Sequence, residues 1–146
     1  MRNLDTLENF RSLPLLYEKS FLHTMKTYDL TQFEVDVLGF LHIYPECDTA
    51  KQICELRKLP KATVSVAVDK LTKKGYLCTT RDVADRRIIH LEVTDSARDA
   101  IESIMSDYEK FIETLFYGFT QEEMDTWAIL QEKITGNIAN ALRKKD

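Results

Sequence analysis

Glycine and proline are scarce in this sequence, with only four and three copies among 146 residues. An all-β architecture needs many tight turns, which these residues usually supply, so their scarcity favours helices. No stretch approaches the ~18 consecutive apolar residues of a membrane-spanning helix, and we expect no membrane association. The opening MRNLDTLENF carries acids and lacks an apolar core, so we expect no signal peptide. The sequence therefore predicts one soluble, mainly helical domain.

Cysteine and histidine are also sparse, with three copies of each. The cysteines form no CxxC pair and the histidines never lie three or four positions apart, so we expect no disulfide framework, no metal and no cofactor. Unpaired cysteines are typical of a reducing cytoplasm. The sequence also lacks a glycine-rich phosphate loop, a GxSxG motif and a usefully spaced pair of histidine and carboxylate. We therefore expect that the protein is not an enzyme.

Charge is distributed unevenly along the chain. The whole sequence has a formal net charge of -4. Residues 49–93, however, contain ten Lys or Arg against five Asp or Glu, a net of +5, which leaves -9 for the remainder. A basic segment inside an acidic protein indicates an anionic partner, and double-stranded DNA is the obvious candidate.

Helix starts can be recognised from capping patterns. A Thr followed three residues later by Glu or Gln predicts a helix N-terminus, and this pattern occurs at 31–34, 49–52 and 120–123. A long helix with apolar residues at helical spacing is expected to continue as far as Phe119. We expect the N-terminal helix to bend or divide at Pro14, because proline removes a backbone donor.

The basic segment has the pattern of a helix-turn-helix followed by a hairpin. A short helix is broken at 59–60, and a second helix over about 61–74 is ended by Gly75 as its C-terminal cap. Two strands are expected at about 76–80 and 88–93. This order predicts a mainly α fold with a small β-hairpin wing, a winged helix-turn-helix.

The second helix of this motif is expected to bury one face and expose the other. Val64, Leu71 and either Ala67 or Val68 should lie in the core. The opposite face carries short polar and basic side chains, which suit the major groove of DNA, and Val66 there could contact a thymine methyl group. The candidate DNA contacts on this helix are Lys61, Ala62, Thr63, Ser65, Val66, Asp69, Lys70 and Lys73.

The turn of the hairpin carries several arginines. A wing with arginines at its tip can enter the minor groove or bind phosphates. Since a carboxylate would repel DNA, we expect Asp85 to pair with Arg87 and to direct Arg86 or Arg87 outward. The candidate contacts on the wing are Arg81, Asp85, Arg86 and Arg87.

Three segments carry a family resemblance: Leu30-Thr31 with Val37-Leu38, then KATVSVAVDKLTKKGYL, then RDVADRRIIHLEVT. Together they resemble the MarR family of winged-helix transcriptional regulators. The resemblance spans the chain and is most specific over residues 30–98. The sequence departs from the family at Glu34, where Gln is frequent, at Ala97, where Gly is usual, and at Val66, where Arg is frequent.

The resemblance implies one chain over 1–146, in which residues 30–95 form the winged helix-turn-helix. Residues 1–29 and 96–146 would be dimerisation helices flanking it. It implies a homodimer that binds a roughly palindromic operator, most typically as a repressor. The composition of the terminal helices supports dimerisation independently of the resemblance, because they carry more aromatic and aliphatic residues than a small winged-helix core can bury.

The resemblance also implies an effector. Members of the family are usually released from DNA by a small, often aromatic, anionic compound that binds between the dimerisation helices and the winged domain. The candidate pocket residues are Tyr17, Phe21, Tyr28, Phe40, His42, Tyr44, Tyr108 and Phe111.

Two alternatives remain. The acidic overall charge and Val66 would suit a winged-helix module that binds a protein, such as an antagonist of another regulator, although that module would not need a basic segment. A redox-sensing regulator would need a reactive cysteine. We expect Cys54 and Cys78 to be packing residues and Cys47, in the loop PECD, to be the most exposed candidate.

Overall fold

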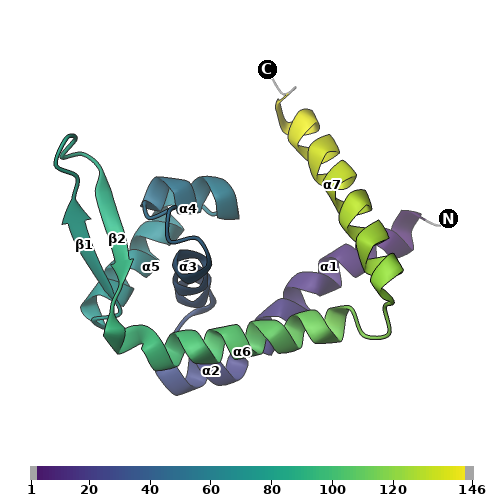
Figure 1. The fold of residues 1–146 in the computed structure, drawn as a ribbon, viewed down its shortest axis with the longest axis horizontal. Helices are drawn as coiled ribbons and strands as arrows, with labels where there is room; N and C mark the ends of the chain where they lie inside the picture. Colours follow the sequence, from purple (N-terminus) through teal and green to yellow (C-terminus); the bar gives the residue numbers. More distant parts are fainter. Residues whose placement is uncertain (1–2, 144–146) are drawn as a thin grey trace. The chain divides into compact units, whose positions relative to one another are not determined.

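The computed structural model describes residues 3–143, with the side chains of residue 8 and residues 10–143. It is mainly helical with one antiparallel hairpin, so the predicted fold class is confirmed (Figure 1). Within the described residues, no helix combines the length and apolar character needed to cross a membrane. In chain order the elements are α1 (Asn3–Ser20), α2 (Leu22–Tyr28), α3 (Gln32–Ile43), α4 (Ala50–Arg57), α5 (Lys61–Lys73), β1 (Leu77–Arg81), β2 (Ile89–Val93), a 3-10 turn η1 (Asp95–Ala97), α6 (Arg98–Leu115) and α7 (Gln121–Arg143).

Contacts divide the chain into two compact units, residues 1–111 and 112–146. The first unit contains the winged helix-turn-helix together with α1, α2 and most of α6. The second contains the end of α6 and α7. The division by role, with residues 30–95 as the DNA-binding region and 1–29 and 96–146 as dimerisation helices, stays a prediction.

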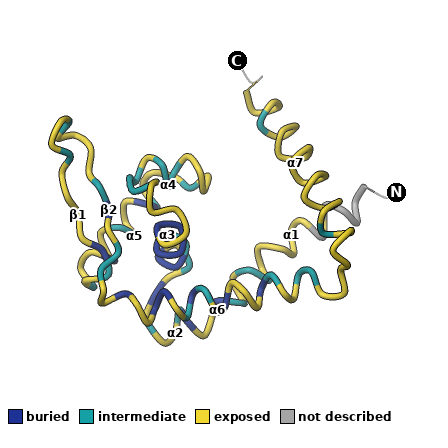
Figure 2. The backbone as a smooth tube through the Cα atoms, viewed as in Figure 1, coloured by how far each residue is buried: buried dark blue, intermediate teal, exposed yellow. Residues whose placement is uncertain are grey.

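The core of the first unit is built around α3, whose middle turns are buried (Figure 2). Its side chains Val37 and Leu38 are completely inaccessible to solvent. Ile53 of α4 and both Val64 and Leu71 of α5 are equally inaccessible. Because both helices of the helix-turn-helix bury their apolar faces on one cluster that includes α3, the position of α5 is fixed by packing.

All three predicted capping boxes form. At the start of α3, the Thr31 side chain accepts a hydrogen bond from the Glu34 amide at 3.3 Å, and the Glu34 carboxylate accepts one from the Thr31 amide at 2.6 Å. The same reciprocal pair forms at 49–52 and at 120–123. These interactions satisfy amides that a helix N-terminus otherwise leaves without partners.

Gly75 ends α5 as predicted. Its φ of 77° is left-handed, a conformation that glycine adopts without steric cost. Its amide donates to the Thr72 carbonyl at 3.0 Å, and the Tyr76 amide donates to the Leu71 carbonyl at 2.9 Å. This pair of hydrogen bonds is a Schellman motif, and it turns the chain directly into β1.

Two helix ends differ from the prediction. α1 is not divided at Pro14 but continues to Ser20 and is interrupted at Phe21, whose amide donates to the Glu18 carbonyl at 3.2 Å; a bend at Pro14 stays a prediction. Pro14 is exposed, so the carbonyl that loses its helical donor can be hydrated. α6 ends at Leu115, and Phe119 lies in the following turn, where its ring meets Phe116 edge-on at 5.4 Å.

The hairpin pairs Leu77 with Val93 at its base and Arg81 with Ile89 near its turn. Each strand begins one residue later than predicted, and β1 also ends one residue later. Leu77 and Leu91 face the core, whereas the outward residues of β1 are exposed.

Candidate nucleic-acid interface and aromatic pocket

The turn between α4 and α5 positions the second helix of the motif. Lys58 ends α4 in the left-handed conformation, with φ 54°, and Pro60 precedes α5 with extended backbone. α5 then buries Val64, Ala67 and Leu71, while Val68 is only half-buried. Between the two candidates for the core position, the structure therefore selects Ala67.

The opposite face of α5 is exposed over its whole length. Asp69 lies beside Lys73, with carboxylate and ammonium 2.8 Å apart, so this acid and this cation largely neutralise each other. Among the described residues, no acidic side chain pairs with Lys61 or Lys70. Thr63 is half-buried, and the exposed candidates are Lys61, Ala62, Ser65, Val66, Asp69, Lys70 and Lys73.

The wing turn is held by two aspartates. Asp82 Oδ1 accepts hydrogen bonds from the amides of Ala84 and Asp85, each at 2.8 Å. Asp85 accepts from the Arg87 amide and Nε at 3.0 Å and from Nη2 at 2.9 Å, so the predicted pairing is confirmed. Hydrogen bonds from Arg87 lower the pKa of Asp85, and the same pairing raises the pKa of Arg87.

Two arginines of the wing are not neutralised by a neighbouring carboxylate in the described part of the chain. Arg81 and Arg86 are exposed, and neither has an acidic partner in the described part of the chain. Figure 1 shows the hairpin extending past the helices of the winged domain, with its turn at the end away from α6. Because Asp85 already holds Arg87, Arg86 is the cation of the turn that has no acidic partner among the described residues.

His90 fastens the wing to the rest of the domain. Its Nδ1 lies 2.9 Å from Asp48, in the loop before α4, and its Nε2 lies 3.0 Å from Asp82. The Leu91 amide also donates to the Asp48 carbonyl at 2.7 Å. Hydrogen bonding to Asp48 and then to Asp82 raises the pKa of His90, and hydrogen bonding to His90 lowers the pKa of Asp82.

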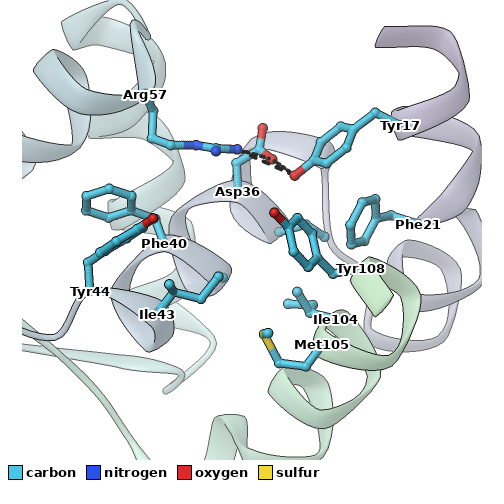
Figure 3. A pocket seen from close by; sticks show the side chains of 12 residues that line it. Tyr17, Phe21, Asp36, Phe40, Ile43, Tyr44, Arg57, Ile104, Met105 and Tyr108 are labelled. Atoms are coloured by element: carbon cyan, nitrogen blue, oxygen red, sulfur yellow. Dashed lines mark hydrogen bonds and ion pairs between the residues drawn. The ribbon is translucent and has the colours of Figure 1, made fainter. Parts of the chain in front are cut away.

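An aromatic pocket lies in the first unit between α1, α3, α6 and the end of α4 (Figure 3). Its cavity measures about 70 Å³. Aromatic and aliphatic side chains make most of its wall, while Asp36 and Arg57 are its charged groups. The lining residues are Tyr17, Phe21, Val35, Asp36, Gly39, Phe40, Ile43, Tyr44, Arg57, Ile104, Met105 and Tyr108.

Three polar side chains meet at one side of this pocket (Figure 3). The Tyr17 hydroxyl donates to Asp36 at 2.9 Å, and Arg57 donates to the same carboxylate oxygen at 3.2 Å. Burial, followed by the nearby Asp36 carboxylate, raises the pKa of Tyr17, so the phenol stays protonated. Tyr17 is on α1 and Arg57 ends α4, so this contact joins the N-terminal helix to the helix-turn-helix.

The structure brings five of the eight predicted pocket residues together: Tyr17, Phe21, Phe40, Tyr44 and Tyr108. Phe111 supports the pocket from outside its lining, since its ring meets Tyr17 edge-on at 5.3 Å. Tyr28 packs against the main core, and His42 lies beside β2 in a separate hollow. The sequence reasoning missed Asp36 and Arg57, whose opposite charges lie 21 positions apart.

The expectation that Cys54 is a packing residue is confirmed, whereas the expectations for Cys47 and Cys78 were wrong. Cys78 is exposed, whereas Cys47 and Cys54 are half-buried and pack against the core. Cys78 follows the buried Leu77 in β1, and alternation along a strand places it on the uncovered side of the hairpin. Among the side chains that the structure describes, no three of His, Cys, Asp or Glu gather as a metal site would require.

A core-packed helix with an exposed polar face, followed by an arginine-bearing hairpin, defines the winged helix-turn-helix class, in which the second helix of the motif typically enters the major groove of DNA. The model of the MarR family matches residues 28–88. The chain is also 30% identical over 129 residues to YwaE of Bacillus subtilis (strain 168), an uncharacterized HTH-type transcriptional regulator, covering 88% of this chain and 75% of YwaE. The protein belongs to the MarR family.

Solved structures share the whole fold. The MarR protein from Peptoclostridium difficile has a TM-score of 0.83 and 26% identity, covering 97% of this chain and 92% of that one. MepR of S. aureus, solved as a complex with DNA, has a TM-score of 0.81 and 18% identity, covering 94% of this chain and 99% of that one. Because the family consists of transcriptional regulators, the expectation that the protein is not an enzyme is confirmed.

Proposed function

We propose that the protein is a homodimeric repressor that binds a near-palindromic DNA operator and is released by a small aromatic ligand. One observation is the main support for DNA binding. α5 and the wing are locked into the core on one side, and on the other side they present four unpaired cations: Lys61, Lys70, Arg81 and Arg86. The MepR–DNA complex, whose fold this chain shares, supports DNA as the partner.

The second unit supports a homodimer. No residue of α7 is buried, as Figure 2 shows, although the helix carries a continuous apolar face. A helix with such a face is stable in water when a partner covers it. A second copy of this chain is the proposed partner. The exposed apolar residues at helical spacing are Trp127, Leu130, Ile134, Ile138 and Leu142.

The aromatic pocket supports release by a ligand. Ligand sites usually have volumes of about 300–1,000 Å³, whereas this cavity measures about 70 Å³. A bound ligand must therefore push the walls apart, and Arg57 is the lining residue that belongs to the helix-turn-helix. Displacing Arg57 from Asp36 would move the end of α4, which the short 58–60 turn connects to α5.

The chemistry of the pocket indicates an aromatic ligand with an acidic group. Tyr17, Phe40, Tyr44 and Tyr108 offer ring surfaces for stacking. Arg57 could exchange the Asp36 carboxylate for that of the ligand, since a guanidinium binds either one with the same geometry. The ligand would thereby break the contact between α1 and α4.

Selection of duplexes from a random pool by the purified protein tests the DNA-binding proposal. At about 100 mM salt, we expect recovery of a palindrome whose half-sites are about ten base pairs apart, one helical turn. Recovery of unrelated sequences would restrict the protein to binding without sequence preference. Recovery of nothing above background would favour a module that binds protein.

Titration of the operator complex with aromatic carboxylates tests the ligand proposal. We expect fluorescence anisotropy of labelled operator to fall as an effective compound is added, and Tyr44→Ala to weaken that response while operator affinity is kept. A response equal in wild type and variant would place the ligand elsewhere.

A further inference from the structure

A second groove lies on the proposed DNA-facing side of the first unit, between the start of α3 and the exposed face of α5. Phe33 forms the α3 wall, and Ala62 and Val66 form the α5 wall. Because Ala62, Val66 and Lys70 are four residues apart, they lie above one another on the same face of the helix. Lys70 stands at the end of the groove.

The apolar walls of this groove are open to solvent. Phe33 is 45% exposed and Val66 is 55% exposed, although both belong to helices whose other faces are buried. Single exposed apolar residues are common, but here residues from two helices form one apolar surface beside the unpaired ammonium groups of Lys61 and Lys70. A partner that fits must combine negative charge with small apolar groups.

An ion pair between a buried glutamate and a half-buried lysine fixes the two walls relative to each other. Glu34, which follows Phe33, is only 1% exposed, and its carboxylate lies 3.5 Å from the ammonium group of Lys74 at the end of α5. Lys74 also donates to the Asp29 carbonyl, just before α3. The start of α3 is therefore tied to the C-terminus of α5, and the groove is preorganised.

We propose that Phe33, Ala62 and Val66 together contact thymine methyl groups, so that the protein selects A·T pairs opposite the middle of α5. The inference rests on the proposed function, since it requires α5 to lie in the major groove. Thymine exposes its C5 methyl group there, beside phosphates that Lys61 and Lys70 can reach. The negative charge and the small apolar groups thus come from one partner, the DNA duplex.

The same surface disfavours G·C pairs. Guanine presents the acceptors N7 and O6 in the major groove, and an arginine or lysine normally donates to them. Val66 and Phe33 have no side-chain donor, so they would remove water from these acceptors without replacing its hydrogen bonds. Selection of thymine is therefore reinforced by rejection of guanine.

Replacement of thymine by uracil tests the inference directly, because uracil keeps every hydrogen-bonding group and lacks only the methyl. Each thymine of the selected operator is replaced in turn, in both half-sites together, and binding is measured by anisotropy at fixed salt. At the positions facing α5 we expect about a fourfold loss of affinity per methyl, or about 15-fold for the symmetric pair.

Protein variants then assign the methyl contact to the groove. Val66→Ala should bind thymine and uracil duplexes almost equally, whereas Leu56→Ala, which trims an exposed leucine of α4, should keep the full uracil effect. Selection with Val66→Arg should replace thymine by guanine at the same position, because arginine donates to N7 and O6. Thermal unfolding confirms that each variant is folded.

The outcomes separate this inference from the proposed function. A specific operator that is insensitive to uracil at every position would overturn the thymine contact and leave DNA binding intact. A uracil effect that persists undiminished in Val66→Ala and Phe33→Ala would also overturn it, because other residues would then contact the methyl. Failure to bind any duplex would overturn the proposed function and this inference together.

Discussion

Replacing Arg86 by alanine should make DNA binding less dependent on salt. Arg86 is exposed at the wing turn without an acidic partner among the described residues, whereas three hydrogen bonds hold its neighbour Arg87 on Asp85. The substitution removes a cation and no contact that folds the wing. Its effect should therefore be electrostatic.

The magnitude follows from the number of unpaired cations. Lys61, Lys70, Arg81 and Arg86 face outward from α5 and the wing of one protomer. A dimer presents about eight such groups. Each phosphate contact makes the slope of log association constant against log salt concentration steeper by about 0.9, so the full slope should be no steeper than about -7. Arg86→Ala removes two contacts and should reduce the slope by about 1.8. The ratio of the wild-type association constant to that of the variant should then fall about 12-fold between 50 and 200 mM salt.

Fluorescence anisotropy with the selected operator, measured at four or more salt concentrations, gives both slopes. Lys133→Ala is the matched control, because it removes one exposed cation from α7 and should leave the slope unchanged. Parallel lines for wild type and Arg86→Ala would refute the reasoning, since the wing arginine would then make no contact with phosphate. A larger decrease in the salt slope for Arg87→Ala than for Arg86→Ala would show that Asp85 releases Arg87 when DNA binds.

Three other predictions test the wing, the dimer and the pocket. His90 has a raised pKa because it bonds to Asp48 and Asp82, so its contribution to stability is fully present below its unfolded pKa of about 6.5 and is lost as pH rises through the folded value. The difference in free energy of unfolding between wild type and His90→Gln, from urea titrations, should therefore be largest near pH 6 and smaller at pH 9. A difference that does not change with pH would contradict a stabilising role for the contacts of charged His90 with Asp48 and Asp82. Leu130→Glu combined with Ile134→Glu should produce monomers in sedimentation experiments, whereas Lys133→Glu, which makes the same change of net charge at an exposed position away from the apolar face, should leave a dimer; dimers from the double variant would exclude this face of α7. Gly39→Val should fill the aromatic pocket, since an added Cβ lies 3.4 Å from Ile104, and should abolish the response to aromatic carboxylates while operator affinity is kept. Gly136→Val, in open space on α7, should retain that response.

Features decided within a few residues of sequence were predictable. The capping boxes at 31–34, 49–52 and 120–123 formed because both partners of each pair lie within one helical turn. The hairpin was placed one residue early because the aspartate turn at Asp82, rather than apolar alternation, sets where pairing stops. Phe119 was assigned to α6 because its spacing is helical, but Gly118, with φ 80°, takes the chain out of the helix.

Contacts between distant elements were not predictable from one sequence. The charged side of the pocket joins Tyr17, Asp36 and Arg57 from three helices, and Arg57 lies 40 positions from Tyr17. Aromatic residues could be proposed because any large ring near the domain junction is a candidate. Nothing in the residues around Arg57 indicates that it turns toward α1 rather than toward solvent.

The sequence alone also could not show which cations are neutralised by ion pairs in the folded protein. The excess of five cations over residues 49–93 indicated an anionic partner but did not say which cations were free. Folding neutralises Arg57 on Asp36, Lys73 on Asp69, and Arg87 on Asp85. The sequence allowed either wing-tip arginine to be the unpaired one; the structure pairs Arg87 with Asp85 and leaves Arg86 without an acidic partner among the described residues. Substitutions of paired cations should therefore mainly change the shape of the DNA-binding surface, whereas substitutions of unpaired ones should change its salt dependence.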